Sequence, residues 1–238
     1  MNINVFLLCY NESPLLPHVI KHYKKYLPSC KITIYDNEST DNSVEIAKNL
    51  GCSVVSWNSN NISDENIRIK LRNNVWKEID SGWIIMADMD EFVCVTEDEL
   101  MNEMKLGTTI LRIQGYNMLG ETETLDLSDI DLQEIKKYVE DGTESKHLCF
   151  FREAINDMNY GPGSHKCKPN GKIVYSSTIY INKHMNFLGL NYYRNKILKR
   201  YARSHEMRKK GWSGHYISNV AKIDERYTTH MKNCKFIA

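Results

Sequence analysis

Apolar and polar residues alternate in blocks along the first hundred residues, and the blocks predict strands followed by helices. The apolar run 3–9 predicts a buried strand, because strands covered on both faces are continuously hydrophobic. Similar short runs predict strands at 31–35, 53–57 and 83–87. Strands that alternate with helices pair in parallel through right-handed crossovers. We therefore expect an α/β fold with a Rossmann-like, mixed but mostly parallel sheet flanked by helices.

Helix signals lie between these strands. Ser13, followed by Pro14, predicts the N-cap of a first helix. Thr96 and Glu99 have capping-box spacing, which predicts another helix there. The same signals predict a helix from 41 to about 50 with Gly51 as its stop, and a longer helix at 66–79.

The second half of the chain is less regular. Residues 110–116 and 172–181 each predict a strand, and the acidic segment 126–141 predicts a surface excursion. Residues 191–210 predict a basic helix. We see no repeat and no linker, so we expect a single domain over 1–238.

Composition and charge narrow the function classes. Lysine and arginine number 31 against 30 acidic residues, and a net charge of +1 does not favour a nucleic-acid partner. The seven cysteines form no C-x-x-C pair, which argues against a zinc ribbon or a disulfide framework. The first residues lack the basic segment of a signal peptide, and no apolar run is long enough to span a membrane. We expect a cytoplasmic protein that is at most peripheral to a membrane.

Three polar turns each follow a predicted strand, at 10–12, 36–41 and 88–91. The carboxyl ends of parallel strands meet at one edge of a sheet, and ligands bind beyond that edge. The three turns should therefore lie together and form a site.

The third turn is an acidic cluster of Asp88, Asp90 and Glu91. A bound divalent cation would relieve the repulsion between carboxylates so close together. Oxygen ligands favour Mg²⁺ or Mn²⁺, and such an ion can bridge the two phosphates of a nucleotide. A D-x-D triplet alone is also typical of a solvated loop, but its position after a buried strand favours a site.

The motifs together resemble family 2 glycosyltransferases of the GT-A fold. The resemblance is carried by Tyr10-Asn11-Glu12, Asp36 to Asp41, Arg72-Asn73 and Met86 to Phe92, and covers roughly residues 1–115. The D-x-D-E-F form is similar to a subgroup of bacterial and large-virus glycan synthesis. In the later half the resemblance rests on Gly-x-His-Lys and Gly-Trp-x-x-His-Tyr, and is weaker.

The resemblance implies a set of nucleotide contacts. Tyr10 and Glu12 would border the nucleoside, Asp36 would hydrogen-bond the base, and Arg72 would face the nucleotide. Asn37 and Glu38 replace the common Asp-Gly of this turn, although the turn remains polar. Asn11 and Asn37 are further candidates for the nucleotide site, although Asn11 could equally be a helix cap.

The resemblance also implies the metal ligands. Asp90 would be the direct ligand of Mn²⁺ or Mg²⁺, Asp88 would contact the ribose or the metal, and Glu91 could belong to the metal shell. GT-A folds often supply a third ligand from a histidine near the end of the domain, which here is His215, with His165 and His184 as alternatives. A histidine in a surface loop is the competing interpretation of His215.

Several residues of the later half are candidates for phosphate or acceptor binding. Lys209 could neutralise a diphosphate, and Trp212 lies in the same Gly-rich segment. His165 and Lys166 follow a Gly-Pro-Gly turn that suits phosphate or acceptor binding, although a plain surface turn would look the same. The basic segment 191–210 predicts an amphipathic helix packed on the sheet, or a surface for anionic lipid headgroups.

The catalytic base is not singled out by any motif. Glu153, Asp157 and Glu121 are candidates, because an inverting transfer needs a carboxylate near the acceptor hydroxyl. A retaining mechanism stays open.

We predict a metal-dependent hexosyl- or deoxyhexosyltransferase that moves a sugar from a nucleoside diphosphate, UDP-linked, to a glycan or lipid-linked acceptor. Residues 1–116 would bind the donor, and residues 117–238 would shape the acceptor pocket. The alternatives are a nucleotidyltransferase with the same carboxylate–metal site and a non-catalytic module that binds sugar nucleotides.

Overall fold

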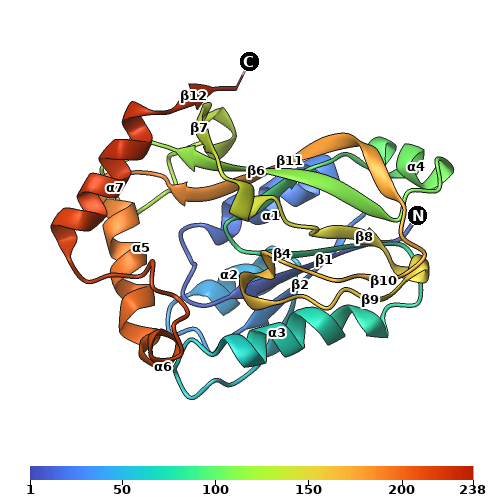
Figure 1. Ribbon diagram of the computed structural model, residues 1–238, viewed down its shortest axis with the longest axis horizontal. Coiled ribbons are helices and arrows are strands. Elements are labelled where there is room, and N and C mark those ends of the chain that lie inside the picture. Colours follow the sequence, from blue (N-terminus) through green and yellow to red (C-terminus); the bar gives the residue numbers. More distant parts are fainter. Residues whose placement is uncertain (238) are drawn as a thin grey trace.

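The computed structural model describes residues 1–237, and its first half is a parallel sheet (Figure 1). Strands β1 (Ile3–Cys9), β2 (Lys31–Asp36), β3 (Ser53–Ser56) and β4 (Trp83–Asp88) pair in parallel in the order β3-β2-β1-β4. Each strand agrees with its predicted range to within one residue. The expected α/β class, a mixed and mostly parallel sheet flanked by helices, is confirmed.

The helices of this half follow most of the predicted signals. Thr96 and Glu99 form the predicted capping box at the start of α4, and Gly51 follows α2 with φ 77°. Ser13 is not the N-cap of α1, because α1 begins at Leu16 and the Ser13 amide donates to the Asp41 carboxylate at 3.1 Å. The elements are α1 (Leu16–Tyr26), α2 (Ser43–Asn49), α3 (Glu65–Asn74) with the 3₁₀ turn η1 (Val75–Glu78), and α4 (Glu97–Lys105).

The second half adds both antiparallel and parallel pairs to the same sheet. Strand β8 (Cys149–Phe151) lies between β4 and β6 (Ile110–Leu119) and is antiparallel to both. Strand β11 (Tyr175–Phe187) pairs with β6 and with β5 (Glu91–Cys94), and the sheet ends at β7 (Lys137–Glu140) and β12 (Lys235–Phe236). The predicted strand 110–116 is confirmed, whereas the one predicted at 172–181 begins at 175 and runs to 187.

The remaining elements are short. Strands β9 (Ile155–Asp157) and β10 (Asn170–Gly171) form a separate two-stranded sheet. Five 3₁₀ turns are described, which besides η1 are η2 (Leu132–Glu134), η3 (Gly142–Glu144), η4 (Arg152–Ala154) and η5 (Pro162–Ser164). The predicted surface excursion at 126–141 therefore contains η2 and the strand β7.

The predicted basic helix 191–210 is broken at Ser204 into α5 (Leu190–Arg203) and α6 (His205–Lys209). The sequence did not predict α7 (Val220–Lys232), which packs against α5. Figure 1 shows α5, α6 and α7 gathered at one end of the sheet. In the part of the chain that the structure describes, no helix is both long and apolar enough to cross a membrane.

The core lies on both faces of the sheet, and β1 shows why. All residues of β1 are buried, with Val5 and Leu7 in one apolar cluster and Phe6 and Leu8 in another. Successive strand residues point to opposite faces, so a strand covered on both sides is mostly apolar, and Asn4 is the one polar residue of β1. Burying one such side chain contributes about 1.5–3 kcal/mol.

Candidate active site

The site begins at the edge where the parallel strands end. Cys9, the last residue of β1, pairs with Asp36 of β2, and Leu8 pairs with Asp88 of β4. The turns after β1, β2 and β4 therefore lie side by side, as the strand order predicts.

The turns after β1 and β2 are joined by hydrogen bonds. The Asn11 amide donates to Ser39 Oγ at 2.8 Å, and the Thr40 amide donates to Asn11 Oδ1 at 2.7 Å. Asn11 has φ 52°, in the left-handed region that asparagine adopts more readily than most residues. Asp36 accepts from the Ser39 amide and hydroxyl at 2.9 and 2.5 Å. Asn11 and Asp36 thus fix the shape of the turns, and their contacts to a nucleotide stay predictions.

Asp90 lies at the centre of the site and is almost fully buried, with 2% of the residue exposed. Its Oδ2 accepts from Lys196 Nζ at 2.6 Å and from Arg200 Nη2 at 3.2 Å, both on α5. His184 Nε2, on β11, lies 3.3 Å from the same oxygen. Burial would raise the pKa of this carboxyl, but the charges of Lys196, His184 and Arg200 hold it well below its ordinary value.

Asp88 is oriented by a buried arginine. Arg72, on α3, donates from Nη2 to Asp88 Oδ1 at 2.6 Å and from Nη1 to Glu65 Oε1 at 3.1 Å. Burial would raise the pKa of Asp88, but Arg72 and then Lys146 lower it to about 2. The sequence predicts that Arg72 faces the nucleotide, and the structure places it beneath Asp88 with 2% of its surface exposed.

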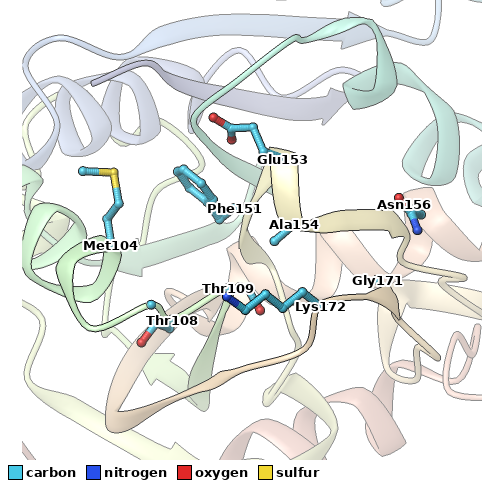
Figure 2. Close-up of a pocket in the computed structure, with 10 residues that line it drawn as sticks. Met104, Thr108, Thr109, Phe151, Glu153, Ala154, Asn156, Gly171 and Lys172 are labelled. Carbon is cyan, nitrogen blue, oxygen red and sulfur yellow. The ribbon is translucent and has the colours of Figure 1, made fainter.

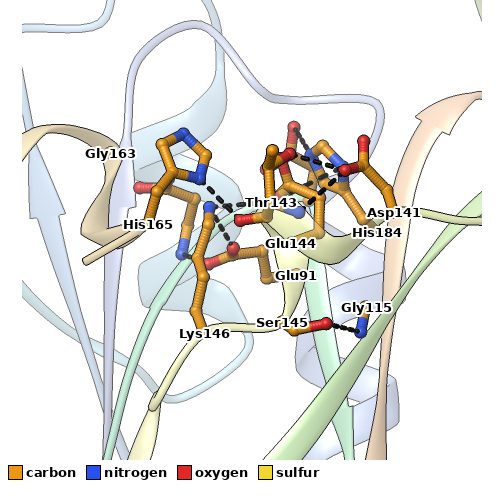
Figure 3. Close-up of polar contacts among 12 residues, drawn as sticks. Glu91, Gly115, Asp141, Thr143, Glu144, Ser145, Lys146, Gly163, His165 and His184 are labelled. Carbon is orange, nitrogen blue, oxygen red and sulfur yellow. Dashed lines mark hydrogen bonds and ion pairs between the residues drawn. The ribbon is translucent and has the colours of Figure 1, made fainter. Parts of the chain in front are cut away.

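Glu91 is buried and bonded to Lys146 (Figure 3). Its Oε2 accepts from the Asp88 amide and its Oε1 from Lys146 Nζ, both at 2.7 Å. Lys146 also pairs with Glu144 Oε2 at 2.9 Å. Burial raises the pKa of Glu91 in spite of Lys146. Sequence reasoning missed Lys146 and Glu144, which lie in an irregular segment without a motif.

Glu12 brings the first motif to the same centre. Its Oε1 lies 3.9 Å from Arg200 Nη2, so Arg200 stands between Glu12 and Asp90. Burial raises the pKa of Glu12 to about 7, although Lys196 and Arg200 oppose the shift. Such a carboxyl changes its charge near neutral pH, which is unusual outside functional sites.

Tyr10 and Asn37 form one side of the site together with Arg203 at the end of α5. The Arg203 guanidinium carbon lies 3.2 Å from the centre of the Tyr10 ring, and its Nη2 donates to Asn37 Oδ1 at 2.8 Å. The Tyr10 hydroxyl donates to Asn61 Oδ1 at 3.1 Å. The sequence-predicted Tyr10 and Asn37 are therefore neighbours, joined by an arginine that no motif indicated.

His184 lies next to Asp90, in the position predicted from the sequence for His215. Its Nδ1 is 2.7 Å from Asn117 Oδ1 and 3.8 Å from Glu144 Oε2. Burial would lower its pKa, but Glu144 and Asp90 outweigh burial and raise it. His184 is thus the histidine in contact with Asp90 among the residues described.

The predicted segment around His215 lies at the outer rim. His215 is exposed, and its ring packs on Tyr216, whose hydroxyl accepts from Arg200 Nη1 at 3.3 Å. Trp212 is half-buried. Lys209 has 70% of its side chain exposed and pairs with Glu206 at 2.8 Å.

His165 is tied to the neighbouring loop rather than to the acidic cluster. Its Nδ1 lies 2.7 Å from the Thr143 carbonyl oxygen (Figure 3), and Lys166 beside it is exposed. Gly163, with φ 62°, donates from its amide to Glu65 Oε1 at 2.7 Å. A Cβ on Gly163 would lie 2.5 Å from the His165 ring, so this turn requires glycine.

The candidate bases Glu153 and Asp157 lie at the opposite end of β4. Glu153 Oε2 accepts from the Gly82 amide at 2.9 Å, just before β4 begins, and Asp157 pairs with Lys77. A strand of this length spans roughly 17 Å, so the Glu153 carboxylate is not near Asp88. Glu121, the third candidate, is exposed and pairs with Lys137 at 2.7 Å.

A cavity of about 520 Å³ opens at the same end as Glu153 (Figure 2). Its lining includes Thr108, Phe151, Glu153 and Lys172. Glu153 is the one carboxylate in this lining, and no residue of the polar turns after β1, β2 and β4 lies beside it. Convergent charges, rather than the size of this cavity, mark the site at Asp90.

One oxygen of each carboxylate at the end of β4, Asp88 Oδ1 and Asp90 Oδ2, is bound by cations of the protein, and a divalent ion would lie beside these cations. Asp88 and Asp90 already accept from Arg72, Lys196 and Arg200. Within residues 1–237, no group of three or more histidine, cysteine, aspartate or glutamate side chains is placed to hold a metal. Mn²⁺ or Mg²⁺ at this site stays a prediction from the sequence.

Known proteins resemble the chain over its first half most clearly. Residues 4–94 match the family described as Glycosyl transferase family 2. Protein RfbJ of Shigella flexneri is 28% identical over 108 residues, which cover 43% of this chain and 76% of RfbJ.

Solved structures show weaker similarity. The crystal structure of S. aureus TarS has a TM-score of 0.48 at 13% identity, covering 85% of this chain but only 39% of TarS. Mannosyltransferase PcManGT from Pyrobaculum calidifontis, in complex with GDP-Man and Mn²⁺, has a TM-score of 0.44 at 10% identity, covering 97% of this chain and 74% of that one. These similarities are low, so the likeness rests on the family match over residues 4–94 and on RfbJ: the chain is similar to the family 2 glycosyltransferases in this part.

Proposed function

We propose that this glycosyltransferase uses a nucleoside diphosphate sugar, UDP-linked, and transfers a hexosyl or deoxyhexosyl group to a glycan or lipid-linked acceptor. The observation that carries the proposal is the position of Arg200 between Asp90 and Glu12. Side chains from the turns after β1 and β4 and from α5 meet there, at the edge of the sheet where ligands of α/β proteins bind.

The donor would lie along this edge. Tyr10, Asn37 and Arg203 border the side proposed for the nucleoside, and Arg200 lies on the side proposed for the diphosphate. Asp88 keeps 29% of its side chain exposed, so it can contact the ribose or phosphates, whereas buried Arg72 positions it. Residues 1–116 would bind the donor, and residues 117–238, which include β11 and α5, would complete the site and shape the acceptor pocket.

The reaction transfers charge to the donor phosphates. The bond between the anomeric carbon and the phosphate oxygen breaks, and its electron pair stays on that oxygen. A new bond forms from the acceptor hydroxyl oxygen to the anomeric carbon, and the hydroxyl proton passes to a base. Fixed positive groups near the leaving oxygen lower the barrier, because they stabilise charge that develops in the transition state. Glu153, bonded at the start of β4, lies too far from this edge to be proposed as the base, and Asp157 stays a candidate from the sequence.

A divalent ion has no step in this proposal, because the carboxylates that would hold it are already paired. Membrane contact through 191–210 also stays a prediction. Most cations of that segment bind groups of the protein itself, as Arg194 does with Asp224. The exposed Lys199, Lys209 and Lys210 are the ones that a membrane surface would meet.

The test is a screen of UDP-, GDP-, CDP- and TDP-sugars by thermal shift, followed by release of nucleoside diphosphate. We expect one sugar nucleotide to raise the melting temperature, since a ligand of the native state stabilises it. Asp90→Asn should abolish release, and the matched variant Asp98→Asn, on the exposed side of α4, should retain it. If no sugar nucleotide binds with EDTA or with Mn²⁺ present, the proposal is wrong.

A further inference from the structure

Two cations of α5 meet a single carboxylate oxygen at the centre of the site. Lys196 and Arg200 are four residues apart, so they share a face of the helix. Lys196 Nζ and Arg200 Nη2 lie 2.6 and 3.2 Å from Asp90 Oδ2. Lys196 keeps 6% of its side chain exposed and Arg200 35%, so Lys196 lies beneath and Arg200 at the surface of the site.

The positive charge at this point exceeds the charge of Asp90. One carboxylate carries one negative charge, and here it meets an ammonium, a guanidinium and the ring of His184. Two further carboxylates are near: Glu12, 3.9 Å from Arg200, whose pKa burial raises to about 7, and Glu144, 3.8 Å from His184, which also pairs with Lys146. A buried lysine is costly to keep charged unless it is fully compensated. The cations of α5 can therefore stabilise a further anionic group that binds next to this helix.

A divalent cation would meet strong repulsion at the same point. An ion bound to Asp90 Oδ2 would lie beside an ammonium group that is 2.6 Å from that oxygen. Like charges at such separations in a poorly hydrated site repel strongly. An anionic diphosphate, in contrast, would gain two charge-assisted contacts, and arginine can bind it in a bidentate manner.

We propose that Lys196 and Arg200, held in place by Asp90, bind and neutralise the donor diphosphate directly, so that nucleoside diphosphate binding needs no divalent cation. This inference rests on the proposed function, and it assigns to α5 the role that the sequence gave to a metal ion. It also gives Asp90 a different role: Asp90 positions the two cations and does not itself ligate a metal.

The test measures binding of UDP and GDP by isothermal titration calorimetry, in EDTA and in Mn²⁺. We expect binding in EDTA, and a loss of about tenfold or more in Arg200→Gln and in Lys196→Met, as for charge-assisted contacts. Arg194→Gln is the matched control, because it removes the same charge from α5 but at the contact with Asp224 on α7. Circular dichroism verifies the folding of each variant. Arg200 is partly exposed, so Arg200→Gln still tests the proposal if Lys196→Met does not fold.

The outcomes separate the two proposals. Binding that disappears in EDTA and returns with Mn²⁺ would overturn the role of α5 but leave the glycosyltransferase proposal intact. Binding in EDTA that neither variant weakens would also overturn it. Absence of nucleoside diphosphate binding under both conditions would reject the donor proposal itself, and this inference with it.

Discussion

The two ends of β4 differ in the contacts that their nearby carboxylates make. At the end of the strand, Asp88 and Asp90 are joined to Arg72, Lys196 and Arg200. At its beginning, Glu153 accepts one backbone hydrogen bond beside an open cavity of about 520 Å³. The comparison teaches that an open volume does not identify the site, whereas buried charges drawn from distant parts of the chain do.

The largest expected effect concerns stability at the charged end. Lys146→Met leaves Glu91 and Glu144 without their shared cation, and breaking a buried pair of this kind costs about 3–5 kcal/mol. Lys172→Met, at the cavity end, removes an exposed lysine and should change the free energy of unfolding by less than about 0.5 kcal/mol. Urea denaturation of both variants measures the difference. Equal stability of the two would show that the ends of β4 do not differ in this way.

A second prediction compares activity at the two ends. Asp88→Asn should lower release of nucleoside diphosphate by about 100-fold, because a group oriented toward the reacting phosphates is lost. Glu153→Gln should keep a rate close to that of the unchanged protein, since its carboxylate lies at the other end of β4. A strong loss in Glu153→Gln would move the active site to the cavity.

A smaller effect is a pH dependence of donor binding. The pKa of Glu12 is raised to about 7 by burial, with Lys196, Arg200 and Lys199 opposing and Asp90 adding to the shift. As the pH falls from about 8 to 6, Glu12 takes up a proton and stops repelling the phosphates, so binding of a sugar nucleotide should tighten by about threefold to tenfold.

Calorimetry across this pH range, with Glu12→Gln as the comparison, measures the effect. The variant should bind with little pH dependence, and an unchanged profile would assign the titration to another group such as His184. The same shift predicts that the contribution of Glu12 to stability falls as the pH rises from about 4.5, the value of a free carboxyl, to about 7, because the folded state holds this proton more tightly.

Much of the fold could be predicted from the sequence, because local patterns determine it. The apolar run of β1 and the capping box at Thr96 each depend on neighbouring residues, and both are as predicted. Ser13 was assigned wrongly because α1 begins only at Leu16, after a turn in which the amides of Leu15 and Leu16 donate to the Glu12 carbonyl. The break at Ser204 was also missed, since α5 and α6 have the same basic composition.

The site was predictable only in part, because many of its contacts join residues that are far apart in the sequence. Strand order alone placed Asp36, Asp88 and the turn at Tyr10 on one edge. Lys196 was not identified, because it lies 106 residues from Asp90 and its segment has the pattern of an ordinary amphipathic helix. Carboxylates at strand ends indicate where charge gathers, but the partners that neutralise it come from tertiary packing.

The most direct test of the account is hydrogen–deuterium exchange of the full chain with and without saturating UDP or GDP. We predict slower exchange at the turns after β1, β2 and β4 and at the end of α5, and unchanged exchange at β9 and β10 beside the cavity. Slower exchange confined to β9, β10 and the start of β6 would contradict the account, because the nucleotide would then bind at the opposite end of the sheet.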